Sequence, residues 1–310
     1  SRLVAIASSW SRRLLWLVVL GACTACYRIR IDETYWLRAR PGTGPDSAAA
    51  AAALPAGYRV VPLRIPVTAA IRLTGVAAVR PDAVTTVLFF GGDDFQVAQN
   101  GPAALRALTG AAPVNVVLLD YPGTGTSEGP ATLVAVKAAA LVAHDTIAAR
   151  RDLAPTGVMV HGHSMGSFIA ASVAEARPVR GLVLQSAATT PDEWRRQFFR
   201  PSLLKWWARP AWPFLRFTID PTLAGEDNVA RVRRFRGPLF VVVGAEDRTT
   251  SPAMSRTLAA SAAPESPTRL AVLPGSGHDD VLTNPGFAAA YGAFVAVVAG
   301  TARQPGPRQP

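Results

Sequence analysis

Cysteine and histidine are scarce in this chain, which has two cysteines and four histidines among 310 residues. These residues are not grouped at the spacing of a metal site, so no bound metal is expected. No glycine-rich phosphate loop opens a helix, and no segment of about 20 to 50 residues recurs. The sequence therefore gives no support for a nucleotide or another cofactor, and it argues against a repeat architecture.

Charged residues are also few, at 17% of the chain, whereas hydrophobic residues make up 49%. A chain of this length and composition can bury one large core. Proteins of the α/β class with this size commonly fold as a single domain. We therefore expect one principal domain.

Short apolar runs of β-forming residues alternate with longer segments of helical spacing. Such alternation indicates a mostly parallel sheet with helices on both faces. The sequence predicts the α/β class, with an eight-stranded sheet whose first two strands form an antiparallel edge. The predicted strands are 59–65, 71–79, 84–90, 114–119, 157–161, 180–185, 239–244 and 269–273. The predicted helices are 96–108, 131–150, 164–176, 251–262 and 286–299.

The most informative stretch is Gly162-His163-Ser164-Met165-Gly166, which lies between a strand-like run and a helix-like segment. This order is typical of a nucleophile elbow, a turn so tight that side chains at Gly162 and Gly166 would collide with neighbouring backbone. The turn would raise the hydroxyl of Ser164 above the end of the sheet. Ser164 is therefore the candidate nucleophile, and it needs a histidine base that a carboxylate orients.

His278 is the best candidate for the base among the four histidines. His161 and His163 lie within the elbow and cannot easily turn onto the hydroxyl, and His144 lies in an alanine-rich helical run. His278 follows a predicted strand and lies in the glycine-rich loop 274–280. A base on such a loop can reach the edge of the sheet.

The carboxylate is expected in the loop after another buried strand. Residues 239–243 form such an apolar run, and Glu246 and Asp247 lie in the loop that follows. Asp247 is favoured over Glu246. The order Ser164, Asp247, His278 along the chain is the one expected for this kind of sheet. A carboxylate oxygen of Asp247 should accordingly lie within about 3.2 Å of Nδ1 of His278.

The oxyanion of an acyl-transfer intermediate needs backbone N–H donors. One donor is expected at Met165, the residue after the nucleophile. The other is expected in the loop after the predicted strand 84–90, where Gly92 is the favoured donor. The pair Gly91-Gly92 is equally typical of a plain turn.

These motifs together resemble the α/β-hydrolase superfamily over residues 58–298. The run Asp120-Tyr121-Pro122-Gly123-Thr124-Gly125-Thr126-Ser127 is similar to the signature that follows the family's fourth strand. The loops after strands 239–244 and 269–273 are similar to the family's acid and base loops. The resemblance implies the α/β-hydrolase fold and hydrolase chemistry. The residues that would take the family's catalytic and oxyanion roles are Ser164, Asp247, His278, Met165 and Gly92.

One departure from the family pattern concerns the oxyanion loop. Many members have a histidine before the oxyanion glycine, where this chain has Phe90. Asp93 and Asp94 also place two carboxylates near the developing negative charge. Backbone donation does not need the histidine, so we expect the fold to be kept and the substrate choice or the rate to be unusual.

The amino end has the features of an export signal. Arg12-Arg13 precede the apolar run 14–22, which is shorter than the span of about 20 residues that crosses a membrane. The run ends at Leu20-Gly21-Ala22-Cys23, which resembles the lipobox of bacterial lipoproteins and implies lipidation of Cys23. Cys26 would then have no disulfide partner. An uncleaved signal anchor is the alternative interpretation.

The predicted organisation has four parts. A signal or lipoprotein anchor at 1–26 is followed by a linker rich in Ala, Pro and Gly at 27–57. The hydrolase domain covers 58–300, with a short cap insertion at about 191–236, and 301–310 is expected to be a disordered tail. The predicted location is the cell envelope, as a membrane-anchored lipoprotein that faces the periplasm or the outside.

Basic and aromatic residues are concentrated in the predicted cap. Residues 194–217 contain six Lys or Arg, eight aromatic residues and no Asp or Glu. The aromatic rings either pack the cap onto the core or, with Trp206 and Trp207, lie at an anionic membrane surface. Such a patch can also bind single-stranded nucleic acid, but a secretory signal would remove the protein from it, so no nucleic-acid partner is expected.

The function predicted from these features is serine hydrolysis of a carboxylic ester with an apolar or lipid-like acyl group. A peptidase, an amidase or a thioesterase would use the same triad, because the triad does not reveal the leaving group. An envelope-binding protein with little turnover on the same fold is the alternative from another class.

Overall fold

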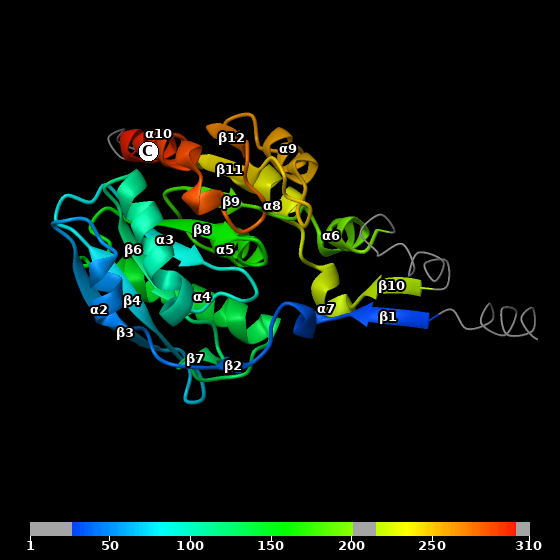
Figure 1. The fold of residues 1–310 in the computed structure, drawn as a ribbon, viewed down its shortest axis with the longest axis horizontal. Helices are drawn as coiled ribbons and strands as arrows, with labels where there is room; N and C mark the ends of the chain where they lie inside the picture. The colour runs from blue at the N-terminus through cyan, green and yellow to red at the C-terminus, as the bar shows by residue number, and fades with distance from the viewer. Residues whose placement is uncertain (1–26, 201–214, 302–310) are drawn as a thin grey trace, which may run out of the picture.

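Residues 27–200 and 215–301 are described by the computed structural model, which has a central eight-stranded sheet with helices on both faces (Figure 1). The two strands of this sheet that come first in the chain are antiparallel and form one edge. Most of the other neighbouring pairs are parallel. The predicted α/β class and edge are confirmed. In spatial order the strands are β12 (Thr268–Leu273), β11 (Leu239–Gly244), β9 (Leu182–Gln185), β8 (Val158–His163), β5 (Thr86–Phe90), β6 (Asn115–Leu119), β4 (Arg72–Val79) and β3 (Arg59–Pro66).

The central strands are buried along their whole length. Every residue of β5, β6, β9 and β11 is buried, which explains why their sequences are continuous apolar runs rather than alternating ones. In a parallel sheet the carboxyl ends of the strands meet at one edge, where ligands of open α/β sheets bind. The loops after β5, β8, β11 and β12 all leave from this edge.

Two hydrophobic clusters form the core of the described chain. One includes α3 (Val97–Ala111) and α10 (Pro285–Thr301), and Phe294 of α10 stacks on Phe240 of β11 with ring centroids 5.4 Å apart. The other includes α4 (Leu133–Ala149), α5 (Gly166–Ala176), α8 (Asn228–Arg234) and α9 (Pro252–Ala260). The predicted helices correspond to α3, α4, α5, α9 and α10.

Residues 27–57 are part of the folded unit, so the prediction of a linker was wrong. This segment forms β1 (Tyr27–Ile31), a short 3-10 turn η1 (Glu33–Tyr35), β2 (Arg40–Pro41) and α2 (Ser47–Ala52). The alanine run becomes a helix because alanine has the highest helix propensity and Asp46 caps it, accepting hydrogen bonds from the N–H groups of Ala48 and Ala49. Ala50 is buried against the sheet.

Trp36 attaches the segment 27–57 to the other hydrophobic cluster, the one that includes α5. Its side chain is buried, and its ring stacks on Phe168 of α5 with centroids 5.6 Å apart. It also contacts Trp194 edge to face at 5.2 Å. β2 pairs in parallel with β7 (Thr124–Gly125), in the loop after β6. The segment is therefore attached to the domain at several points.

The chain between β9 and β11 contains α6 (Pro191–Phe198), β10 (Leu215–Ile219), α7 (Pro221–Ala224) and α8. β10 does not join the central sheet but pairs in parallel with β1, at a distance in sequence of almost 190 residues. Figure 1 shows this two-stranded ribbon beside α6 and α7, away from the central sheet. Trp206 and Trp207 of the predicted cap lie outside the described residues.

The predicted anchor 1–26, with Cys23 and Cys26, and nearly all of the predicted tail 301–310 also lie outside the described residues. Within residues 27–200 and 215–301, no helix has both the length and the apolar character that a membrane span requires.

Candidate active site

Ser164 lies in a tight turn between β8 and α5, with a backbone φ of 53°. A positive φ is strained for a residue other than glycine, so the surrounding structure must enforce it. A Cβ atom on Gly162 would lie 2.3 Å from the carbonyl oxygen of Gly166, and one on Gly166 would lie 2.2 Å from that of Phe90. Only glycine fits at both positions, as the sequence predicted.

His278 contacts the hydroxyl of Ser164 from the loop after β12. Its Nε2 lies 2.9 Å from Oγ of Ser164, which is a hydrogen-bond distance. The ring is partly buried, with a side chain 15% exposed. The structure thus brings together the candidate nucleophile and the candidate base, which are separated by 114 residues.

Asp247 contacts the other nitrogen of the same imidazole. Its Oδ2 lies 2.8 Å from Nδ1 of His278, inside the limit of about 3.2 Å that the sequence analysis set. The side chain is fully buried, and Oδ1 accepts hydrogen bonds of 2.8 Å from the N–H groups of Thr249 and Thr250. These bonds orient the carboxylate toward the imidazole.

Four other carboxylates, in the acid loop, in the base loop and at the start of α6, have no hydrogen bond to the ring of His278 in the described part of the chain. Asp192 pairs with Arg195 and Arg196 on its own helix. Oδ1 of Asp280 accepts from the N–H of Gly277 at 2.6 Å. Glu246 and Asp279 have no hydrogen bond to the ring in the described part of the chain. Among the residues that the structure describes, Asp247 alone has a carboxylate hydrogen-bonded to Nδ1 of His278.

The electrostatics of the pair favour an ionised acid and a basic imidazole. Burial alone would lower the pKa of His278, but the hydrogen bond and charge of Asp247, helped by the charges of Asp279 and Asp93, raise it above its ordinary value. Burial would likewise raise the pKa of Asp247, yet the contact with His278 and the hydrogen bonds from Thr250 lower it. Asp247 is therefore a carboxylate that stabilises the protonated form of the base.

The candidate oxyanion donors, Met165 and Gly92, lie next to Ser164. Met165 is the N-terminal cap residue of α5, and a Cβ built on Gly92 would lie 3.5 Å from Cβ of Ser164. Among the residues that the structure describes, no acceptor is recorded for the N–H of either Met165 or Gly92. Two unpaired donors beside a nucleophile are the arrangement that a developing oxyanion requires.

The carbonyl oxygen of His278 is held by two further side chains that the sequence analysis did not assign to the site. Nε2 of His163 lies 3.2 Å from this oxygen and Oγ of Ser186 lies 3.1 Å from it. Because a carbonyl only accepts, Nε2 of His163 carries a proton. Burial lowers the pKa of His163 to about 4, so the ring is neutral at pH 7.

The two remaining histidines are buried and contact other side chains. His161 is fully buried, and its Nε2 lies 3.0 Å from Oε1 of Gln185. Burial lowers its pKa to about 3. His144 is buried on α4 and contacts Asp145. Neither ring contacts Ser164.

Asp120, which opens the signature after β6, supports the oxyanion loop indirectly. Its buried Oδ1 accepts a hydrogen bond of 2.8 Å from the N–H of Val97 at the start of α3. A Cβ on Gly125, where φ is 56°, would lie 2.2 Å from the other oxygen. Ser127 donates to the carbonyl of Asp120 at 2.8 Å. The signature therefore shapes a turn and anchors the helix that follows the Gly92 loop.

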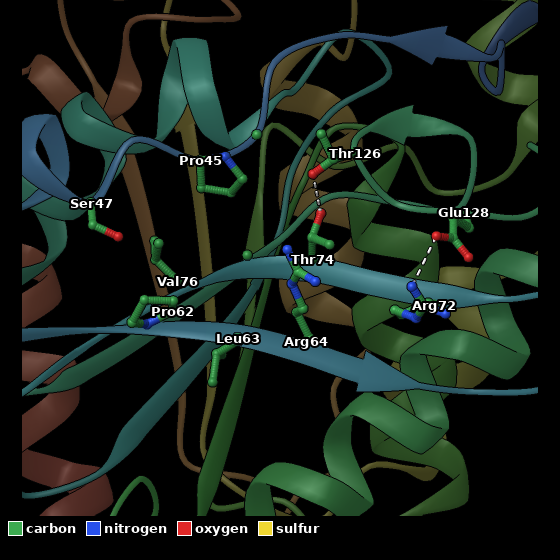
Figure 2. A pocket seen from close by; sticks show the side chains of 12 residues that line it. Pro45, Ser47, Pro62, Leu63, Arg64, Arg72, Thr74, Val76, Thr126 and Glu128 are labelled. Atoms are coloured by element: carbon green, nitrogen blue, oxygen red, sulfur yellow. Dashed lines mark hydrogen bonds and ion pairs between the residues drawn. The ribbon is translucent and has the colours of Figure 1, made fainter.

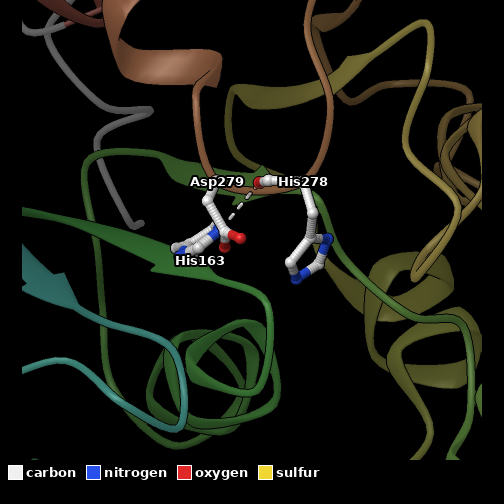
Figure 3. Close-up of side chains that lie close together, drawn as sticks. All are labelled: His163, His278 and Asp279. Atoms are coloured by element: carbon white, nitrogen blue, oxygen red, sulfur yellow. Dashed lines mark hydrogen bonds between the residues drawn. The ribbon is translucent and has the colours of Figure 1, made fainter.

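One group of side chains in the described part of the chain has the composition of a metal site, and it overlaps the triad (Figure 3). His163, His278 and Asp279 each offer a ligand atom, and these atoms lie within 4.8 Å of one another. Both ring nitrogens of His278 already contact Asp247 and Ser164. The ring is thus arranged as a base between acid and nucleophile rather than as a ligand.

A cavity of about 410 Å³ lies away from the triad, beside β3 and β4 (Figure 2). Arg72 and Glu128 form an ion pair of 3.0 Å at its wall, and Thr74 and Thr126 are joined by a hydrogen bond of 2.9 Å. These polar groups satisfy one another. The cavity includes none of the residues assigned to catalysis.

Comparison with known proteins identifies the family of this chain. The sequence profile of the alpha/beta hydrolase family matches residues 87–290, which is more than half of the chain. An uncharacterized protein of Mycobacterium tuberculosis (Rv2307c) is 28% identical over 167 residues, a match that covers 54% of each chain. The present chain thus spans about half the length of that relative.

Solved structures of two archaeal esterases have a similar fold. The esterase Pf2001 of Pyrococcus furiosus superposes with a TM-score of 0.61 at 15% identity, over 80% of this chain and 92% of that one. The hyperthermophilic esterase of Pyrobaculum calidifontis has a TM-score of 0.61 at 17% identity, over 82% and 87% of the two chains. Identities this low show a shared fold and leave the substrate open.

Proposed function

Because the chain belongs to the alpha/beta hydrolase family, we propose that it is a serine hydrolase that cleaves carboxylic esters. The observation that carries the proposal is the continuous contact from Asp247 through His278 to Ser164, with distances of 2.8 Å and 2.9 Å. A serine hydroxyl is a weak nucleophile until a base takes its proton, and this arrangement supplies the base and orients it.

The first half of the reaction forms an acyl-enzyme. Oγ of Ser164 attacks the acyl carbon while Nε2 of His278 takes the hydroxyl proton, and Asp247 stabilises the resulting imidazolium. The bond between the acyl carbon and the leaving oxygen then breaks, and His278 returns the proton to that oxygen, so that an alcohol leaves.

In the second half, water replaces the alcohol. His278 takes a proton from the water, the hydroxide attacks the acyl carbon, and the proton returns to Oγ of Ser164 as the carboxylic acid leaves. In each half the N–H groups of Met165 and Gly92 donate to the oxyanion of the tetrahedral intermediate. Removal of one such donor typically slows an enzyme by a factor of about 10² to 10³.

An apolar acyl group is supported by the aromatic side chains next to the acid loop. Nε2 of Gln197 in α6 donates to the carbonyl of Arg248, the residue after Asp247, at 3.2 Å. Phe198 follows on the same helix, stacks on Trp194 with centroids 5.2 Å apart and is 37% exposed. An exposed ring at this place can contact an apolar substrate.

The proposal is tested with a fluorophosphonate probe, which labels only an activated serine. The wild-type chain should be labelled, and Ser164→Ala should not. Ser172→Ala should be labelled like wild type, because the Ser172 hydroxyl donates to the carbonyl of Ile169 within α5. Absence of label on the folded wild-type chain would indicate a binding protein on a hydrolase fold.

The leaving group is tested with a panel of p-nitrophenyl esters of graded acyl length and matched aminoacyl anilides. Higher kcat/KM for the esters, increasing with acyl length, supports the proposed substrate class. A labelled enzyme that turns over the anilides and not the esters would keep the serine mechanism and refute the ester assignment.

A further inference from the structure

Two segments of this chain contain basic residues and no acidic ones, and together they account for its net positive charge. Residues 1–31 and 194–219 together hold 11 of the 32 Lys and Arg residues and none of the 21 Asp and Glu residues. The rest of the chain therefore has 21 basic and 21 acidic residues and no formal net charge. The whole net charge of +11 belongs to these two segments.

The fold brings the described ends of the two segments side by side. β1 and β10 pair in parallel, with Arg28 opposite Arg216 and Arg30 opposite Thr218. Residues opposite each other in a sheet have their side chains on the same face. All four of these residues are exposed, so one face of the ribbon carries three arginines and a threonine.

The other face of the ribbon is apolar and packs on the body of the protein. Ile31 is buried in the core, and Ile219, its partner in β10, packs against the same cluster. Phe217 stacks on Phe199, which follows α6, with ring centroids 4.4 Å apart. The ribbon is thus fixed by its apolar face, and its arginine face is directed away from the core.

The arginines on this face are incompletely neutralised. Arg30 pairs with Asp220, yet its side chain stays 66% exposed. Arg28 and Arg216 have no acidic partner in residues 27–200 and 215–301, and the sequences that adjoin the ribbon outside these ranges contain no acid. Like charges directly opposite in a sheet are destabilising unless an external anion offsets them.

We propose that the arginine face of the β1–β10 ribbon docks on an anionic lipid surface, a role that goes beyond the proposed hydrolysis and does not depend on it. A lipid surface is favoured over nucleic acid because both candidate membrane attachments, the apolar run 14–22 and the predicted lipidation site Cys23, lie close before β1 in the sequence. Basic residues next to Leu, Val and Trp are typical of segments that bind at the head-group boundary. An anionic leaflet attracts such a basic cluster, and salt weakens this attraction by screening the charges.

Cosedimentation of the full chain with vesicles tests this docking. Phosphatidylcholine vesicles are compared with phosphatidylcholine vesicles that contain phosphatidylglycerol, at low and at high salt. The wild-type chain should bind the anionic vesicles more tightly, and this difference should shrink at high salt. Each of Arg28→Gln and Arg216→Gln should weaken binding to anionic vesicles about fivefold, and the double variant about 25-fold.

Two matched variants separate local from general charge effects. Arg106→Gln/Arg256→Gln removes two exposed arginines elsewhere on the domain and should leave the preference for anionic vesicles unchanged. Arg28→Lys/Arg216→Lys keeps the charge and should bind like wild type. Thermal melting followed by circular dichroism establishes that each variant is folded.

Three results would overturn the proposal. One is an unchanged preference for anionic vesicles in the folded Gln double variant, and another is equal loss in the control double variant. The third is binding of a single-stranded oligonucleotide more tightly than the anionic vesicles, with the same dependence on Arg28 and Arg216, which would assign the face to nucleic acid.

Discussion

Nε2 of His163, the residue before the nucleophile, lies 3.2 Å from the main-chain carbonyl oxygen of His278. The loop that carries the base is therefore positioned by the elbow that carries the nucleophile. Ser186, at the end of β9, donates to the same oxygen at 3.1 Å and has a strained φ of 45°. The carbonyl of Ser186 in turn accepts from Thr250, whose hydroxyl also contacts Asp247. One hydrogen-bonded network thus joins the three loops that carry Ser164, Asp247 and His278.

His163 is accordingly a positioning residue, and its removal should affect turnover more than substrate binding. We expect His163→Leu to lower kcat up to about 100-fold with little change in KM, because a displacement of about 1 Å in a catalytic group has an effect of that size. His163→Gln keeps a donor and should retain more activity. Equal losses in the two variants, or a loss that follows a fall in melting temperature, would indicate a packing role only.

The network also predicts that the two donors to the His278 carbonyl are coupled. In a double-mutant cycle with His163→Leu and Ser186→Ala, the loss in kcat for the double variant should differ from the product of the single losses, because the residues share one acceptor. Independent effects would show that each residue acts on its own loop. Steady-state kinetics on a soluble short-chain ester provide the measurement.

Ser164→Ala should lower kcat by a factor of at least about 10³ while the chain remains folded. Alanine retains the Cβ atom, so the strained turn and the packing of α5 are unchanged, and the melting temperature should be close to that of the wild type. The comparison is made with an ester panel and a preparation free of wild-type enzyme. Ester hydrolysis retained by the pure variant would refute the mechanism.

The pH dependence of kcat/KM should report the pKa of His278, the proposed base. Protonated His278 cannot accept the proton of Ser164, so kcat/KM should fall as the pH drops below the pKa of His278, which lies above its ordinary value. Asp247→Asn removes the charged carboxylate that contributes most to raising the pKa of His278. The acidic limb of the profile should therefore move to lower pH, and the plateau should fall by about 10⁴ because the imidazole loses its orientation. An unmoved limb would mean that another group titrates.

The contacts between Asp247 and His278 also make the stability of the fold depend on pH. The folded state raises the pKa of His278, so its contribution is fully present below the unfolded pKa and is lost as the pH rises through the folded pKa. The folded state lowers the pKa of Asp247, so its contribution is present above the unfolded pKa and is lost as the pH falls through the folded one. The pair therefore stabilises the fold most at pH values above the unfolded pKa of Asp247 and below the unfolded pKa of His278.

The central sheet and the contacts of the triad could be predicted because each is encoded locally. The central strands are uninterrupted apolar runs. Each side chain of the proposed triad lies directly after a strand, at the elbow after β8 or on the acidic or glycine-rich loop after β11 or β12. The His163 and Ser186 contacts could not be predicted, since they depend on where a main-chain carbonyl more than 90 residues away lies in space. No pattern of residue types marks that acceptor.

The ordered segment 27–57 was missed for a different reason. A run of alanines with nearby Pro and Gly has the composition of a linker, and composition does not reveal the surfaces that such a run can cover. Asp46 gives a helix start that a local reading could have detected. The burial of Trp36 depends on α5 and α6, which lie more than 100 residues further along the chain.

Trp36 provides a direct test of whether residues 27–57 belong to the folded unit. Its side chain is 7% exposed and contacts Phe168 and Trp194, so Trp36→Ala should destabilise the domain by about 3 to 5 kcal/mol. Trp36→Phe retains part of the stacking and should cost less. Thr43→Ala changes an exposed residue of the same segment and should have almost no effect. Chemical denaturation of the full chain measures all three. Equal stability of Trp36→Ala and Thr43→Ala would mean that the segment is attached loosely, as a linker would be.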